Sequence, residues 1–158
     1  MDNNGVLGRL RYLLDISDAM VAHMIRSAGI EVTEQEVSCM LRDETAEGYL
    51  HCLNSVLGAF LDALIHERRG PPPPGASLPP TDNRKLTNND ILKKLRVAFK
   101  LTEPDVEAVF ALGDMRMSKP ELRALFRNDG QPNFRPCGDQ ALRRFLVGLT
   151  RWVKQPRR

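Results

Sequence analysis

Asn3-Asn4-Gly5-Val6-Leu7-Gly8-Arg9-Leu10-Arg11 stands near the start of the chain and returns as Asn88-Asn89-Asp90-Ile91-Leu92-Lys93-Lys94-Leu95-Arg96. The offset between the two stretches is 85 residues. Held at this offset without a gap, the match continues to the last apolar run of each half, through pairs such as Phe60 and Phe145. Apolar residues recur at helical spacing in both halves, so the sequence predicts one helical unit that is present twice.

We therefore expect an all-α fold, a tandem duplication of a four-helix unit. The first copy comprises residues 1–69 and the second residues 84–158, called copy one and copy two below. The two copies are expected to pack together with a pseudo-two-fold relation, because a unit of this size is marginal by itself. Between them lies a proline-rich linker, residues 70–83. Its prolines exclude helix and favour an extended spacer, and they also resemble a ligand for proline-reading domains.

Helix boundaries can be read from capping residues. The side-chain oxygen of Asn3 or Asn4 is expected to cap the first helix by accepting a bond from a free amide. Asn54 and Asp139 are expected to do the same for the fourth helix of each copy. Gly29 and Gly113 are expected to end the second helix of each copy, since glycine adopts a positive φ readily.

Charge is divided unequally between the copies. Residues 1–69 hold six arginines and eleven acidic residues, a net charge of −5. Residues 84–158 hold seventeen basic and eight acidic residues, a net charge of +9. The two copies either attract each other, or copy two meets an anionic partner.

Groups that carry catalysis or bind metal are hard to find. Cys39, His51 and Cys52 match no zinc spacing, and a fourth ligand is missing. A nucleophilic role for Cys137 with Asp139 lacks an activating base. We therefore expect no enzyme activity, no cofactor and no metal site.

The compartment follows from the cysteines and the hydropathy. Three cysteines without framework spacing indicate free thiols and a reducing compartment, which favours a cytoplasmic location. No apolar run approaches the length of a membrane span, and no signal-peptide pattern opens the sequence. We expect no association with a membrane.

Two arginine pairs keep their identity in both copies, Arg11 with Arg96 and Arg42 with Arg127. Each pair can be structural, as an ion pair or a bond to carbonyls at a helix end. The alternative is a pair of anion-contacting groups related by the duplication.

The leading hypothesis for function is a non-enzymatic helical binding or adaptor protein that acts on a protein partner. The alternative is DNA or RNA binding through copy two, whose second and third helices resemble a helix-turn-helix. The candidate anion- or partner-binding residues are all basic and all in copy two: Lys93, Lys94, Lys119, Arg123, Arg127, Arg135, Arg143 and Arg144.

Two stretches also carry a resemblance to a known family. They are residues 88–96, quoted above, and Asn133-Phe134-Arg135-Pro136-Cys137-Gly138-Asp139-Gln140-Ala141-Leu142-Arg143-Arg144-Phe145-Leu146. Through them the chain resembles the YehS-like family of uncharacterised bacterial proteins, over nearly its whole length. Copy one departs from the pattern where Leu53-Asn54-Ser55 replaces Gly138-Asp139-Gln140, and the proline-rich linker is a further departure. The resemblance implies a duplicated domain in a bacterial cytoplasm and brings no active site with it.

Overall fold

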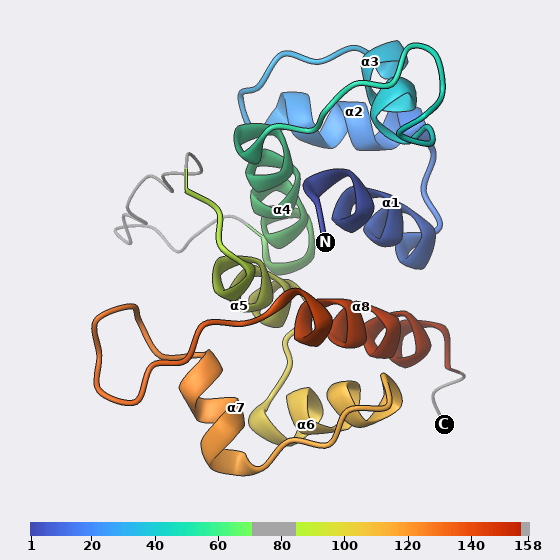
Figure 1. The fold of residues 1–158 in the computed structure, drawn as a ribbon. Coiled ribbons are helices and arrows are strands. Elements are labelled where there is room, and N and C mark those ends of the chain that lie inside the picture. The colour runs from blue at the N-terminus through green and yellow to red at the C-terminus, as the bar shows by residue number, and fades with distance from the viewer. Residues whose placement is uncertain (71–84, 156–158) are drawn as a thin grey trace. The chain divides into compact units, whose positions relative to one another are not determined.

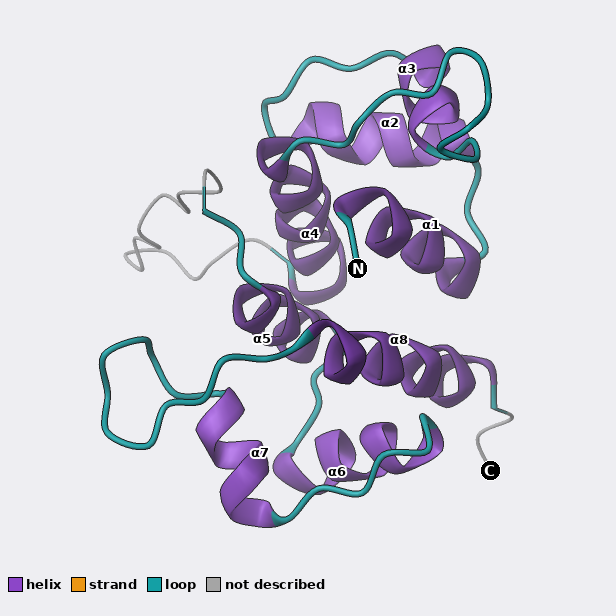
Figure 2. Ribbon diagram, viewed as in Figure 1, coloured by secondary structure: helices purple, strands orange, loops and turns teal. Residues whose placement is uncertain are grey.

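The computed structural model describes residues 1–70 and 85–155, and these form eight α-helices without a strand (Figures 1 and 2). The helices of copy one are α1 (Asn3–Leu14), α2 (Asp18–Ser27), α3 (Glu34–Met40) and α4 (Asn54–Arg69). Those of copy two are α5 (Asn88–Ala98), α6 (Glu103–Leu112), α7 (Lys119–Leu125) and α8 (Asp139–Lys154). Each helix of copy two begins at the offset read from the sequence, so the all-α tandem duplication is confirmed. Residues 71–83 of the predicted linker lie outside the described residues.

The chain divides into two compact units, with the division falling between Leu86 and Thr87. In copy one α4 packs against α1 and α2, and α3 packs on α2. In copy two α8 packs against α5 and α6, and α7 packs on α6. Each unit has its own core, with fully buried side chains such as Phe60 in copy one and Phe145 in copy two. No helix in the described part of the chain is long and apolar enough to cross a membrane.

The predicted caps of the first and fourth helices are wrong. Asp2 caps α1 by accepting from the amide of Gly5 at 2.8 Å, and Thr87 caps α5 in a reciprocal capping box. Leu53 and Gly138 hold the N-cap positions of α4 and α8, without a side-chain bond. The paired asparagines are therefore inside their helices, which frees their amide groups for bonds to other segments.

Asn3 and Asn88 bind the start of the fourth helix in their own copy. The Asn3 Nδ2 donates to the carbonyl of Cys52 at 3.0 Å and to Asn54 Oδ1 at 2.7 Å. Asn88 makes the two equivalent bonds in copy two. The side chains predicted to cap the fourth helix thus serve instead as acceptors that join it to the first.

Asn4 and Asn89 are buried at 8% and 5% exposure and hold the loop between the third and fourth helices. The Nδ2 of Asn4 donates to the carbonyls of Met40 and Leu50, and its Oδ1 accepts from the amide of Cys52 at 3.0 Å. Asn89 repeats all three bonds. A buried amide with its groups satisfied in this way fixes three backbone positions at once.

Gly29 follows the C-cap of α2 with the expected positive φ, 94°, and Gly113 is the C-cap of α6 as predicted. The reason predicted for Gly113 is wrong, because its φ is −86° and the positive φ falls one residue later, at Asp114. Glycine is required at 113 because a Cβ there would lie 1.9 Å from the carbonyl oxygen of Arg144. The end of α6 and the backbone of α8 therefore approach more closely than any side chain would allow.

Candidate functional site

A pocket of about 250 Å³ opens in copy two between α5, α6 and α7. Its lining combines three arginines and one carboxylate with an apolar floor: Arg96, Glu103, Val106, Leu122, Arg123, Phe126 and Arg127. The three guanidinium groups come from the end of α5, from α7 and from the residues that follow α7. The fold is what brings them together, because Arg96 is far from the other two in sequence.

Arg96 is half-buried and held in place on two sides. Its Nε donates to the carbonyl of Leu101 at 3.0 Å. Its guanidinium lies over the ring of Phe126, 4.9 Å from the centroid. A cation over an aromatic face is attracted by the electron density of the ring. Arg96 is thus a preorganised positive group at one wall of the pocket.

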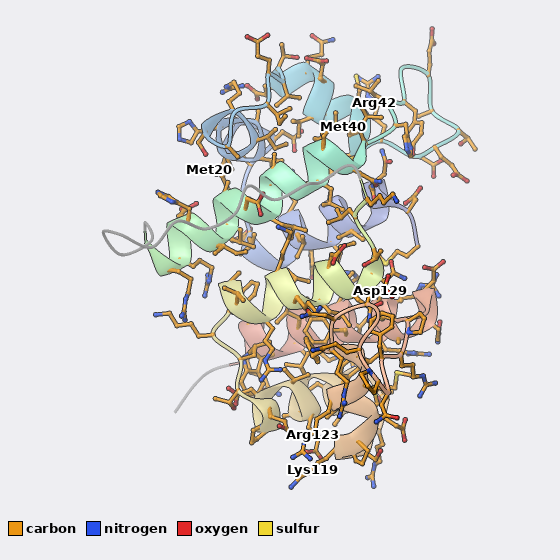
Figure 3. The ribbon with its side chains drawn as sticks, turned by 90° about the vertical axis from the view of Figure 1, so that its left-hand side faces the viewer. Met20, Met40, Arg42, Lys119, Arg123 and Asp129 are labelled. Atoms are coloured by element: carbon orange, nitrogen blue, oxygen red, sulfur yellow. The ribbon has the colours of Figure 1, made fainter. Side chains whose placement is uncertain are left out.

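Arg123 forms the exposed rim. Its Nε lies 3.1 Å from Glu103 Oε1, and the two side chains are 58% and 36% exposed. Ion pairs this accessible to water contribute little to stability, on the order of 0–1 kcal/mol. An anionic ligand can therefore replace Glu103 as the partner of Arg123 at a small cost in free energy. Lys119 lies one turn earlier on α7 and is also exposed (Figure 3).

Arg127 supplies the third guanidinium and is half-buried. Its Nη1 donates to the carbonyl of Pro132 at 2.9 Å, which closes the loop before α8. Its Nε is buried and makes no hydrogen bond to any residue that the structure describes. A buried N–H donor without an acceptor is unfavourable, and an acceptor brought by a ligand would relieve it.

The equivalent place in copy one has a different composition. Arg11 stands for Arg96 and Asp18 for Glu103, while Ser38 replaces Arg123. Asp18 accepts from Ser38 Oγ and from Arg11 Nε, each at 2.6 Å. The bond from Ser38, with that from Arg11, holds the pKa of Asp18 below its ordinary value despite partial burial. In copy one the charge of Arg11 is thus neutralised by Asp18. In copy two the pocket contains three arginines and only one glutamate.

Both conserved arginine pairs therefore have structural bonds. Arg42 donates from Nη1 to the carbonyl of Glu47 at 2.9 Å, as Arg127 does to Pro132. Arg11 is ion-paired and Arg96 binds a carbonyl. Each of the four arginines thus has a structural partner, and in copy two Arg96 and Arg127 also line one and the same pocket.

The predicted site residues divide between this pocket and other places. Arg123 and Arg127 line it, and Lys119 lies beside it on α7. Lys93 donates to Asn128 at 3.1 Å, and Lys94 is half-buried on α5. The remaining three do not line it: Arg135 lies 3.7 Å from Glu121, Arg143 donates to Gln140, and Arg144 is half-buried on α8.

The predicted list of site residues omits Arg96, Glu103 and Phe126, which also line the pocket. Arg96 belongs to the arginine pairs for which anion contact is the alternative to a structural role. Glu103, next to the N-cap of α6, has a position typical of a charge that favours a helix start, and Phe126 has the spacing of an apolar core residue. No local pattern distinguishes such residues from ordinary surface and core positions.

Thiol chemistry finds no support in the described residues. Burial raises the pKa of Cys52 to about 12 and that of Cys137 to about 11. Both thiols are therefore protonated near neutral pH and are poor nucleophiles. Within residues 1–70 and 85–155 no group of three or more His, Cys, Asp or Glu is placed to hold a metal ion.

The structure of copy two resembles a helix-turn-helix less closely than its sequence does. Residues 113–118 connect α6 to α7, a longer link than the three- or four-residue turn of that motif. The helix α7 that would read bases has only seven residues, and the carboxylate of Glu121 is exposed in its first turn.

Comparison with known proteins identifies the family of this chain. The family model described as "Protein of unknown function (DUF1456)" matches residues 3–70 and again residues 88–154. The chain belongs to this family. It is also 38% identical over 149 residues to the uncharacterized protein YehS of Escherichia coli (strain K12), covering 94% of each chain. This confirms the resemblance noted from the sequence. No solved structure matches the chain.

Membership in the family agrees with the fold. The two matched segments of the DUF1456 model coincide closely with the helical parts of copy one and copy two. The family carries no described activity, so any function has to be argued from the geometry of the site itself.

Proposed function

We propose that this DUF1456 protein is a non-enzymatic binding protein that acts on a protein partner through copy two. The pocket between α5, α6 and α7 receives an acidic segment of that partner. The observation that carries this proposal is the convergence of Arg96, Arg123 and Arg127 over an apolar floor. Guanidinium groups bind carboxylates through paired N–H donors, and they bind more strongly where water is partly excluded.

The composition of the pocket favours a peptide over a nucleic acid. Val106, Leu122 and Phe126 offer apolar contact to a side chain next to the carboxylate. The net charge of −5 on residues 1–69 repels a long polyanion but tolerates a short acidic segment. A protein partner is therefore the better match for the whole chain.

Nucleic-acid binding is the second candidate, and one observation favours it. Lys119 and Arg123 lie one turn apart on α7, and Arg127 follows just after the helix ends, so three basic residues stand close together for phosphate contacts. It requires no base reading by α7, so it would be insensitive to sequence. Its signature is a steep dependence of affinity on salt concentration.

The deciding experiment measures fluorescence anisotropy with three labelled probes: a peptide of alternating glutamate and phenylalanine, duplex DNA and single-stranded RNA. We expect the peptide to bind, and Arg123→Ala to weaken it by about tenfold, which corresponds to about 1.4 kcal/mol. The matched control is Arg143→Ala, an exposed arginine outside the pocket whose Nη1 donates to Gln140 Oε1 at 2.8 Å. It should leave the affinity unchanged.

Two outcomes would contradict the proposal. Equal losses from Arg123→Ala and Arg143→Ala would show diffuse attraction to the charge of copy two rather than a site. Tighter binding of DNA or RNA than of the peptide, falling steeply with added salt, would replace the protein partner with the second candidate.

A further inference from the structure

Copy one contains a second hollow that the proposed function does not use. It has a volume of about 400 Å³ and opens between the first half of α1 and the loop after α3. Its lining is glycine, apolar and acidic side chains with one arginine: Asp2, Asn4, Gly5, Gly8, Met40, Leu41, Arg42, Asp43, Glu44 and Tyr49. All of these residues belong to copy one, so the hollow is complete within that unit.

The hollow exists in part because Gly8 has no side chain. Gly8 lies inside α1, where glycine costs about 0.5–1 kcal/mol relative to alanine. Its φ is not positive, and an added Cβ would meet only Leu41 Cδ2 at an ordinary 3.7 Å. Neither backbone conformation nor close packing requires glycine here. Position 8 therefore lacks a side chain that could extend across the hollow.

Copy two shows which side chain spans the equivalent place. Lys93 stands at the position of Gly8, and Asn128 at the position of Asp43. The half-buried Lys93 reaches across from α5, and its Nζ donates to Asn128 Oδ1 at 3.1 Å. The duplicated fold thus places a lysine amine where copy one has open space.

The polar lining of the hollow in copy one is more acidic than its counterpart. Asp2, Asp43 and Glu44 stand where copy two has Thr87, Asn128 and Asp129. The single arginine, Arg42, donates to the carbonyl of Glu47. Copy one therefore offers three carboxylates to a cation where copy two offers one.

The charge of Asp43 is supported by its surroundings. The hydroxyl and amide of Thr45 both donate to Asp43 Oδ1, at 2.6 and 2.9 Å, and hold the pKa of Asp43 below its ordinary value. Burial, followed by the negative charges of Asp2 and Glu44, raises the pKa of Tyr49. The hollow is thus negative at neutral pH, with an aromatic ring in its wall.

We propose that the hollow of copy one is a docking site for a lysine side chain of a protein partner. The methylene stem of that lysine lies along Gly8 and Leu41, and its ammonium group reaches Asp43 and Glu44. Lysine suits such a place because its stem packs on apolar surface while its charged end stays near water and carboxylates. This site lies outside the pocket of copy two and stands whether or not that pocket binds an acidic segment.

The test follows amide signals of the full ¹⁵N-labelled chain in NMR spectra while the peptide acetyl-Ala-Lys-Ala-amide is added. We expect the Gly5 and Leu41 signals to shift as the peptide binds. Gly8→Lys fills the hollow as Lys93 does in copy two and should abolish these shifts. Gly8→Ala is the matched control, because it removes the glycine but leaves the hollow open, and its shifts should persist.

A second probe separates a lysine site from general attraction to negative charge. The same peptide acetylated on the lysine Nζ has the same stem without the charge and should cause no shift. The proposal is overturned if Gly8→Lys retains the shifts, if the acetylated peptide causes them equally, or if the lysine peptide causes none in the wild type. Arg123→Ala should leave the shifts intact, which keeps this test independent of the pocket in copy two.

Discussion

Two asparagines, Asn4 and Asn89, each join distant segments of their own copy through buried side-chain hydrogen bonds. Each is buried on the first turn of its helix and binds backbone groups on both sides of the loop that precedes the fourth helix. The bonds connect positions 36 to 48 residues apart. They hold the loops whose residues Asp43, Glu44 and Arg127 enter the two hollows.

Replacing Asn89 with alanine should destabilise the protein by about 2–4 kcal/mol. The carbonyls of Leu125 and Arg135 and the amide of Cys137 would lose their partner together. Urea unfolding followed by circular dichroism measures the change. Asn128→Ala, an exposed asparagine in the same copy, is the control and should stay within about 0.5 kcal/mol. Equal effects of the two changes would refute the structural role of Asn89.

The buried thiols predict a loss of stability at alkaline pH. The folded pKa values of about 12 for Cys52 and about 11 for Cys137 lie above the ordinary value of a thiol, about 8.5. The native state therefore keeps protons that the unfolded chain releases, and stability falls as pH rises through that window. The urea midpoint should drop between pH 8 and 10 more in the wild type than in Cys52→Ala/Cys137→Ala. Identical slopes in the two proteins would exclude this cause.

At this scale the sequence predicted residue types better than residue roles. Asn3 and Asn4 have the chemistry of helix caps, but so do Asp2 and Thr87, which stand directly before the paired asparagines and accept the hydrogen bonds from the first-turn amides of Gly5 and Asp90. The true partners of the asparagines are distant in the chain, so local spacing could not reveal them.

At the scale of elements, α6 and α8 are in closer contact than their counterparts in copy one. Gly113 and Gly148 let the two backbones approach, where copy one has Ala28 and Ala63. The core side chains differ as well, since Phe110 stands at the position of Ile25. The rings of Phe110 and Phe145 lie 5.1 Å apart at 55°, a favourable tilted arrangement.

Gly148→Ala should destabilise the protein by about 1–3 kcal/mol, although alanine favours helix. Its Cβ would lie 1.8 Å from the carbonyl oxygen of Val109, so α6 and α8 would have to separate. The control is Gly8→Ala in α1, where the new methyl group makes an ordinary contact. That change should stabilise by about 0.5–1 kcal/mol. Thermal unfolding compares them, and shifts of the same sign would contradict the argument.

The elements themselves could be predicted, and the pocket could not. Helical periodicity and the repeat at a fixed offset place all four helices of each copy. The pocket depends on the end of α5 meeting α7, which brings Arg96 to Arg123 and Arg127. The packing angles between helices decide which basic residues share a surface. The spacing of charges along the sequence does not reveal those angles.

At the scale of the whole molecule, duplication kept one scaffold and changed what each copy offers. In copy one Arg11 is ion-paired with Asp18, and an acidic hollow opens at Gly8. Copy two fills that place with Lys93 and opens a basic pocket instead. The opposite charges noted from the sequence thus correspond to two different cavities, for which we propose an acidic segment and a lysine side chain as the respective ligands.

The predicted packing of the two copies has a direct test, because the sequence has a single tryptophan, Trp152, in copy two. Its fluorescence reports the unfolding of copy two, while circular dichroism reports both copies. Leu10→Ala removes a fully buried side chain from copy one and should cost about 2–5 kcal/mol. If the copies unfold together, the Trp152 transition shifts as far as the circular dichroism transition. Leu53→Ala, at a 59% exposed position of copy one, should move neither. A Trp152 transition that stays in place while circular dichroism gains a second step would show that the copies fold independently.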